Sequence, residues 1–293
     1  MTDITTPKRV FPHAREAAES ASHIASVPQT DHSAYRLAFQ DMDFLLREDL
    51  RPVRFQLELL KPELLLDEAE IASTFVFYGS ARIPEAAKAD AILAAASTDS
   101  QRRIAERLKA KAHHYDEARA LARLASRVGR DAEGKRQFVV CSGGGPSIME
   151  AANRGAADEG AESIGLNIVL PHEQMPNAWV TPELSFRFHY FALRKMHFLL
   201  RARAVAVFPG GFGTLDEAFE LLTLVQTGKV APIPILFFGR DYWQRIVNFE
   251  ALVEEGVIAE RDLHLFKYVE SAEEAWAHIC EAYAGGEAKL DCE

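Results

Sequence analysis

The chain has 293 residues and a mass of 32.6 kDa, and its 33 Lys and Arg against 43 Asp and Glu give a net charge of −10. Hydrophobic residues make up 48% and charged residues 26%, the balance of a globular protein rather than of a disordered or fibrous chain. The acidic balance excludes the extended basic surface that binds nucleic acid or an anionic membrane. Any bound phosphate therefore has to be held locally, by backbone N–H groups and a few cations.

The sequence also lacks signals for export or membrane insertion. Its first residues have no apolar core like that of a signal peptide, and no stretch approaches the roughly 18 apolar residues of a membrane span. The three cysteines, Cys141, Cys280 and Cys292, form no CxxC pair, which excludes a disulfide scaffold and a Cys-rich zinc site. We expect a cytoplasmic protein with no membrane partner.

The first 72 residues differ in pattern from the rest. Residues 1–32 have no sustained apolar stripe and are predicted to form a mobile tail or arm. From Tyr35 apolar residues recur at near-helical spacing, and Pro52 and Pro62 divide the next segment, up to Leu66, into one or two further helices. We expect residues 1–72 to be a helical extension, packed on a main domain of residues 73–293 or used as an oligomer interface.

Strands alternate with helices from Ser73 onward. Short apolar runs predict buried parallel strands at residues 74–78, 137–141, 163–170, 204–208 and 234–238, with a short strand near 265–269. Helical patterns lie between them, in a long Ala-rich region before residue 128 and at 147–160, 187–200, 214–226, 242–255 and 273–283. This alternation predicts an α/β fold with a doubly wound, Rossmann-like parallel sheet.

Glycine-rich turns follow three of the predicted strands, at residues 79–82, 142–147 and 209–214. In such a sheet ligands bind beyond the carboxyl ends of the strands. Glycine lets the backbone approach a ligand closely, and the next helix offers unpaired N–H groups that suit a phosphate. Neither the dinucleotide motif GxGxxG nor a P-loop is present. The turns predict a phosphate-bearing ligand bound without either motif.

Three charged residues near these turns allow two interpretations. Glu217 lies three residues after Thr214, so the pair fits a capping box as well as a functional site. Arg194 and Lys195 lie in an otherwise apolar helix, where they fit either a site or a solvated helix edge. Spacing alone leaves both alternatives open.

Histidines and cysteines give no metal motif. His172, His189 and His197 lack the spacing of metal ligands, and Cys141 ends a buried strand with no evident histidine partner. We expect all four to be structural.

Residues 209–217 read PGGFGTLDE and match the PGGxGTxxE motif of the LOG (lonely guy) family. Other landmarks of that family occur in the same order, namely Gly79-Ser80, the turn at 143–146 and Arg194-Lys195. On these motifs the chain resembles the LOG family, in its long bacterial form, from about Ser73 to Tyr283. Many relatives are labelled lysine decarboxylases, but no Schiff-base lysine with a pyridinium partner is evident here. No cofactor is expected.

The resemblance implies hydrolysis of the N-glycosidic bond of a purine, adenine-type nucleoside 5′-monophosphate to free base and ribose 5-phosphate. It makes Arg194 and Glu217 the catalytic residues, with the carboxylate beside a sugar that becomes cation-like in the transition state. The substrate-binding residues that it implies are Ser80, Arg82, Gly143, Gly144, Gly145, Lys195, Gly210, Gly211, Gly213 and Thr214. It implies no metal, and it implies a homodimer or higher homo-oligomer because family sites are shared between subunits.

Two features depart from the small family members. Residues 189–193 read HYFAL where those members carry Met-His-Glu, in a segment that lines the base pocket in the family, so the preferred base stays open. About 70 residues also precede the first strand. The alternative function is a non-catalytic nucleotide-binding or sensing module that uses the same turns. The presence of both Arg194 and Glu217 favours the enzyme.

Overall fold

The computed structural model describes residues 11, 13–171 and 175–284, and seven parallel strands between residues 74 and 269 form one sheet. The strands are β1 (Thr74–Tyr78), β2 (Val139–Ser142), β3 (Ile164–Ile168), β4 (Ser185–Phe188), β5 (Ala202–Val207), β6 (Ile235–Phe238) and β7 (Lys267–Val269). Their order across the sheet is β4-β3-β2-β1-β5-β6-β7, and every neighbouring pair is parallel. The predicted α/β, doubly wound parallel sheet is confirmed.

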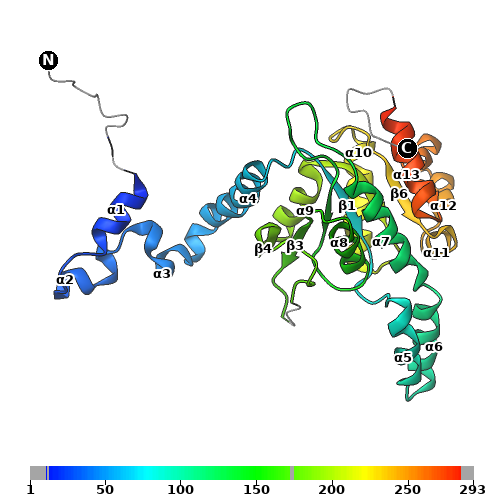
Figure 1. The fold of residues 1–293 in the computed structure, drawn as a ribbon, viewed down its shortest axis with the longest axis horizontal. Helices are drawn as coiled ribbons and strands as arrows, with labels where there is room; N and C mark the ends of the chain where they lie inside the picture. The colour runs from blue at the N-terminus through cyan, green and yellow to red at the C-terminus, as the bar shows by residue number, and fades with distance from the viewer. Residues whose placement is uncertain (1–10, 12, 172–174, 285–293) are drawn as a thin grey trace. The chain divides into compact units, whose positions relative to one another are not determined.

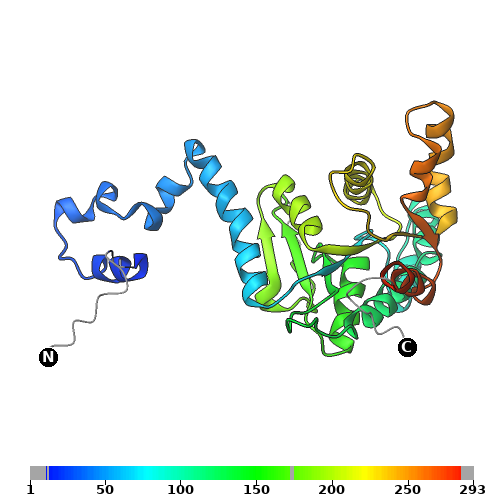
Figure 2. The same ribbon diagram turned by 90° about the horizontal axis from the view of Figure 1, so that it is seen from above.

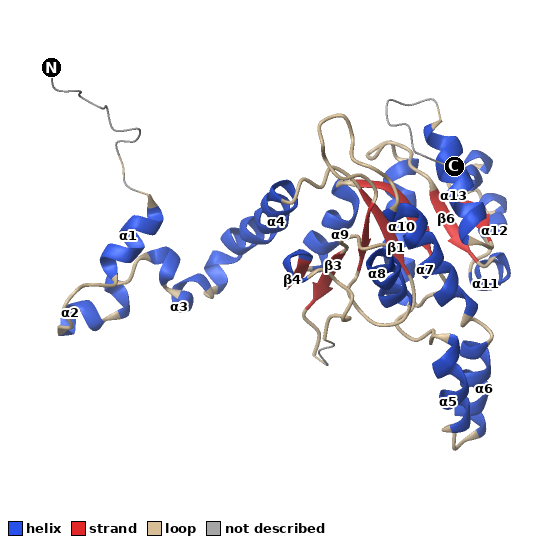
Figure 3. Ribbon diagram, viewed as in Figure 1, coloured by secondary structure: helices blue, strands red, loops and turns tan. Residues whose placement is uncertain are grey.

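Helices cover both faces of this sheet (Figures 1 and 3). The helices after β1 are α5 (Ala86–Ala94), α6 (Asp99–Lys109), α7 (His113–Ser126), α8 (Ile148–Asp158), α9 (Phe191–Leu200), α10 (Phe212–Gln226), α11 (Arg240–Ile246), α12 (Phe249–Glu254) and α13 (Ala272–Tyr283), with short 3-10 turns at Pro182–Leu184 and Glu260–His264. Of these, α5 and α6 pack on each other and project away from the sheet (Figure 1). In Figure 2, α7 and α8 (green) and α13 (dark red) lie on one face, and α9 and α10 (yellow-green) lie on the other. The Ala-rich region predicted as one long helical stretch is divided into α5, α6 and α7.

The core follows from the alternation of side chains along β1, all of whose residues are buried. Phe75 and Phe77 pack into the cluster formed with α7, α8 and α13. Tyr78 makes an edge-to-face contact with Phe198 of α9, at 5.1 Å between ring centroids. A strand buried on both faces reads as a continuous apolar run, which is why the sequence predicted it well.

Two elements differ from expectation. Residues 187–200 were predicted to be mostly helical, but the chain forms β4 before α9 begins at Phe191. In β4, Phe186 and Phe188 are buried while Arg187 is exposed, which is the alternation of an edge strand. The predicted helix at 242–255 is likewise two helices, α11 and α12, with Asn248 capping the second.

The chain divides into two compact units, Met1–Leu57 and Glu58–Glu293. In the first unit the structure shows α1 (Ala14–Ala21), α2 (Pro28–Asp31), α3 (Met42–Leu45) and 3-10 turns at Ser33–Tyr35, Ala38–Gln40 and Glu48–Leu50. The helices at 14–21 and 28–31 replace the predicted tail there, while residues 1–10 and 12 lie outside the described part. None of the described apolar side chains before Glu58 is buried. Helix α4 (Arg51–Glu68) continues through Pro62, so the alternative of two separate helices is wrong.

The order of the strands determines where a ligand fits in the second unit. From β1 the chain moves outward through β2, β3 and β4, and it then returns to β5 on the other side of β1. The connections after β1 and β5 therefore run in opposite directions and leave a crevice at the carboxyl ends of these two strands. None of the described helices has the length and apolar character needed to span a bilayer.

Candidate active site

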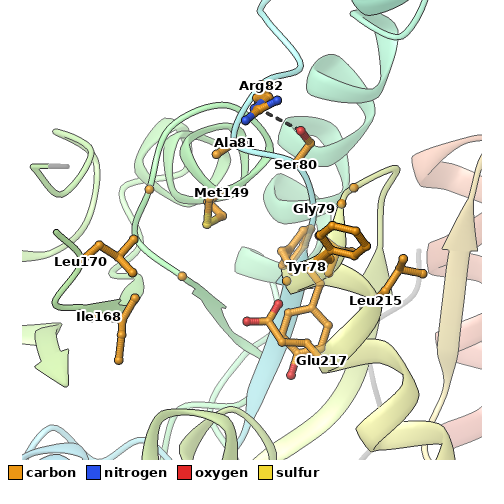
Figure 4. Close-up of a pocket in the computed structure, with 18 of the residues that line it drawn as sticks. Tyr78, Gly79, Ser80, Ala81, Arg82, Met149, Ile168, Leu170, Leu215 and Glu217 are labelled. Carbon is orange, nitrogen blue, oxygen red and sulfur yellow. Dashed lines mark hydrogen bonds between the residues drawn. The ribbon is translucent and has the colours of Figure 1, made fainter. Parts of the chain in front are cut away.

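A cleft of about 840 Å³ opens at this crevice, within the size range of small-molecule sites. Its walls come from the turns after β1, β2 and β5, from β3 and from helices α9, α10 and α11. Figure 4 shows Glu217 projecting into it beside Tyr78, with Met149, Ile168 and Leu170 on the opposite wall. The three glycine-rich turns singled out in the sequence therefore converge on one cavity.

Arg194 and Glu217 meet in this cleft. Nη1 of Arg194 donates to Oε1 of Glu217 at 3.0 Å, and the two side chains are only 10% and 13% exposed. Nε of Arg194 donates to the carbonyl of Leu166 in β3 at 2.6 Å. The guanidinium also lies over the ring of Phe198, at 4.9 Å from its centroid. Arg194 is thus fixed on three sides, and the alternative of a solvated helix edge is wrong for it.

The surroundings of Glu217 in the folded chain stabilise its protonated form, compared with a carboxyl group exposed to water. Burial raises the pKa of Glu217 from its ordinary value of 4.5 to about 7, with Arg194 acting in the opposite direction and Asp216 adding to the rise. Oε2 of Glu217 has no hydrogen-bond partner among the residues that the structure describes. A carboxyl group with one oxygen held, the other open to the cleft and a pKa near neutral is suited to proton transfer.

Two of the three glycines in the turn after β2 are required by the protein's own side chains. A Cβ on Gly143 would lie 2.5 Å from Nη2 of Arg194, and one on Gly144 would collide with the amide of Asn167. Gly144 also has φ +72°. Gly143 and Gly145 line the cleft, whereas the carbonyl of Gly144 accepts a hydrogen bond from the backbone N–H of Asn177. Gly144, predicted to bind substrate, is not part of the cleft lining.

The turn after β5 is open to the cleft. Gly210, Gly211, Gly213 and Thr214 all line it, and a Cβ on Gly211 or Gly213 would meet no atom within 4 Å. Helix α10 begins at Phe212 with Gly211 as its N-cap, two residues earlier than predicted. The first N–H groups of α10 have no partner within the helix, so they are available to an anion.

This helix start also decides the capping-box alternative. Thr214 is the third residue of α10 rather than its N-cap, and its buried hydroxyl packs against Gly210. Glu217 bonds to Arg194 instead of to the backbone of the helix start. The capping box allowed by the spacing of Thr214 and Glu217 is therefore wrong.

Of three further residues predicted to bind substrate, two line the cleft and one does not. Ser80 and Arg82 line it, and the hydroxyl of Ser80 accepts from the backbone N–H of Arg82 at 3.0 Å (Figure 4). Lys195 does not line the cleft and pairs with Asp216 at 3.1 Å and with Glu220 at 3.3 Å. The structure thus brings Ser80 and Arg82 to the site but not Lys195.

Sequence reasoning missed three polar residues of the cleft. Tyr78 ends β1, and its burial, with Glu217 nearby, raises its pKa well above the ordinary range. Asn167 interrupts the apolar run of β3, a signal that was present in the sequence. Tyr242 lines the cleft and donates its hydroxyl to the carbonyl of Gly210 at 2.6 Å. No motif marks Tyr242, because it lies 32 residues from Gly210.

The residues expected to be structural give no metal site. In the described part of the chain no group of three or more His, Cys, Asp and Glu is placed to hold a metal ion. His197 and Cys141 are buried and His189 is exposed, while His172 lies outside the described residues.

The chain is similar to known proteins in both sequence and structure. The model of a family described as "Possible lysine decarboxylase" matches residues 149–279. The probable cytokinin riboside 5′-monophosphate phosphoribohydrolase LOG4 of Oryza sativa subsp. japonica is 26% identical over 149 residues, which is 50% of this chain. The corresponding enzyme LOG1 of Arabidopsis thaliana is 29% identical over 141 residues, or 46% of this chain. The chain spans 64% of the length of each of these two relatives.

Among solved structures, the X-ray structure of TM1055 matches 72% of this chain and 99% of its own, with 19% identity and a TM-score of 0.45. That likeness is too distant to bear on function. The match to the family model covers nearly all of α8 together with α9, α10 and the strands between them, and it includes the PGGxGTxxE motif. The sequence matches confirm that this chain resembles the LOG family.

Proposed function

We propose that the protein hydrolyses the N-glycosidic bond of a purine, adenine-type nucleoside 5′-monophosphate, releasing the free base and ribose 5-phosphate. The observation that carries this proposal is the contact of Arg194 with Glu217 in a cleft beside the open N-terminus of α10. The relatives named as cytokinin riboside 5′-monophosphate phosphoribohydrolases support the same reaction class. Backbone N–H groups suited to a phosphate and a carboxyl group suited to a ribose therefore line the same cleft.

The cleft has two chemically different ends. The N-terminus of α10 and the glycines at 210, 211 and 213 offer backbone N–H groups to the 5′-phosphate. The opposite wall is apolar, with Met149, Ile168 and Leu170, and suits the flat face of a base (Figure 4). Glu217 lies between these ends and so faces the ribose of a nucleotide bound in this direction.

The chemistry follows from this placement. The bond between C1′ of the ribose and the base nitrogen breaks, and the ribose passes through an oxocarbenium-like state that a nearby carboxylate stabilises. A water molecule adds to C1′ and gives one proton to the ionised form of Glu217. The departing base nitrogen keeps the electron pair of the broken bond and takes one proton from solvent, and Glu217 then returns its proton to solvent, so that one water is consumed overall. Arg194 holds Oε1 of Glu217, so that Oε2 is the oxygen that orients the water or the ribose hydroxyls.

The test is incubation of the purified protein with AMP, GMP, CMP and UMP, with free base followed by chromatography. We expect adenine release from AMP and a loss of about 10²–10⁴-fold in Glu217→Gln, the usual contribution of such a group. Glu220→Gln is the matched control, because Glu220 lies one turn further along α10, outside the cleft lining, and pairs with Lys195. Tight AMP binding with no base released from any nucleotide would instead favour the non-catalytic binding module.

We also propose that the protein is a homodimer or higher homo-oligomer with residues 73–293 as its catalytic domain and residues 1–72 as an extension, located in the cytoplasm. Large apolar side chains exposed on α9, Met196 and Leu200, support association. Light scattering coupled to size exclusion measures the state directly. A monomer at micromolar concentration would contradict this part of the proposal.

A further inference from the structure

Helix α4 contacts both ends of α9, the helix that carries Arg194. At the start of α9, Oε1 of Glu58 accepts from the backbone N–H of His189 at 2.8 Å, and Oε2 accepts from that of Tyr190 at 3.1 Å. Tyr190 is the N-cap of α9. A carboxylate at this position satisfies N–H groups that the helix leaves unpaired and also interacts favourably with the helix dipole.

At the other end of α9, its C-cap residue Arg201 is held by the same helix. Nη2 of Arg201 donates to Asp67 at 2.8 Å and to the carboxylate of Glu63 at 3.2 Å. Between the two ends, the buried ring of His197 lies 3.6 Å from Glu63. Residues 58–67 of α4 therefore fix α9 along its whole length.

The position of Arg194 depends on the start of α9. The backbone N–H of Arg194 donates to the carbonyl of Tyr190 at 3.1 Å, so the residue that Glu58 holds is one helical turn before Arg194. The guanidinium of Arg194 has little freedom to compensate for a movement of this helix, because it already bonds to Leu166 and Glu217. A displacement of about 1 Å is enough to cost on the order of 10²-fold in rate at such a site.

We propose that Glu58 is a positioning residue, which holds the N-terminus of α9 so that Arg194 stays opposite Glu217. The expected effect on kcat rests on the proposed nucleotide hydrolysis, but the expected effect on the position of α9 does not. It gives the end of the N-terminal extension a direct role at the site, through a contact between residues 131 positions apart in the chain.

The test compares Glu58→Ala, Glu58→Gln and the control Glu68→Ala, an exposed position at the end of α4. For AMP hydrolysis we expect kcat about tenfold lower in Glu58→Ala and KM changed less than twofold, because the turn after β5 is untouched. Glu58→Gln keeps one acceptor oxygen and should recover part of kcat. Glu68→Ala should match the wild type.

Hydrogen exchange of residues 189–201 provides a readout that does not need activity. Faster exchange there in Glu58→Ala than in Glu68→Ala supports the proposal, and Glu58→Gln serves if the alanine variant does not fold. A folded Glu58 variant with unchanged kcat and unchanged exchange would overturn the proposal. So would an equal loss of kcat in Glu58→Ala and Glu58→Gln if exchange at residues 189–201 were no faster in either variant. If the wild-type protein releases no base, the proposed function is refuted but the role of Glu58 is not. Hydrogen exchange then decides whether Glu58 holds α9 in place.

Discussion

The protonation of Glu217 links the candidate site to the stability of the whole fold. In the unfolded chain this carboxyl loses its proton near its ordinary pKa of 4.5, but burial raises the pKa in the folded chain to about 7. Between these values the folded state binds one proton more than the unfolded state, so the free energy of unfolding falls as the pH rises. This contribution is fully present below pH 4.5 and is lost as the pH passes through about 7.

The size of the effect follows from the two pKa values. A rise from 4.5 to about 7 corresponds to about 3 kcal/mol, of which about 2–3 kcal/mol is lost between pH 5 and pH 8. Glutamine at position 217 has nearly the same shape and no charge at any pH. The difference in unfolding free energy between the wild type and Glu217→Gln isolates this one titration, because all other groups are shared.

The assay is urea denaturation of both proteins at pH 5, 6, 7 and 8. We expect the wild type to lose about 2–3 kcal/mol relative to Glu217→Gln across this range. A difference that stays constant from pH 5 to pH 8 would refute the reasoning. It would mean that the charge of Arg194 outweighs burial and keeps Glu217 ionised throughout.

Two further substitutions test how the walls of the cleft are held. Tyr242→Phe removes the hydroxyl that bonds to Gly210 and should cost about 1 kcal/mol of stability and weaken AMP binding several-fold, which thermal melting and calorimetric titration would measure; unchanged affinity would contradict this role. Ser147, the N-cap of α8, has φ 69° and donates its hydroxyl to the carbonyl of Ile83. Since glycine tolerates this backbone and alanine does not, Ser147→Gly should be more stable than Ser147→Ala by about 1–3 kcal/mol in urea denaturation, and equal stabilities would argue against strain at this residue.

The parts of the molecule that the sequence predicted are those decided by local pattern. β1 and residues 204–207 of β5 are short, buried and mostly apolar runs with glycine within three residues of their ends, the pattern of a parallel strand buried on both faces. The turn at 209–214 was predicted to belong to the site because parallel strands present their carboxyl ends on one edge. β4 was missed because a four-residue edge strand directly before a helix is too short to show its own period.

The contacts that the sequence did not predict join distant segments. Spacing alone linked Glu217 only to Thr214, and the family resemblance implied that Arg194 and Glu217 act at one site. The fold adds that the two side chains, 23 residues apart in the chain, bond directly. The glycines at 143 and 144 were predicted to make room for a ligand, whereas they make room for Arg194 and Asn167. Whether a missing Cβ serves a ligand or a neighbouring side chain depends on tertiary packing, which local patterns do not contain.

The cleft draws its walls from segments spread from Phe77 to Ile246, so it exists only when the whole sheet has formed. A molecule that fills it binds the native state and has no equivalent site on a partly folded chain. By mass action such a ligand stabilises the entire second unit, by about 3 kcal/mol at a hundred times its Kd. Resistance to proteolysis or heat in the presence of a nucleotide or of inorganic phosphate thus measures occupancy of the cleft, independently of any turnover.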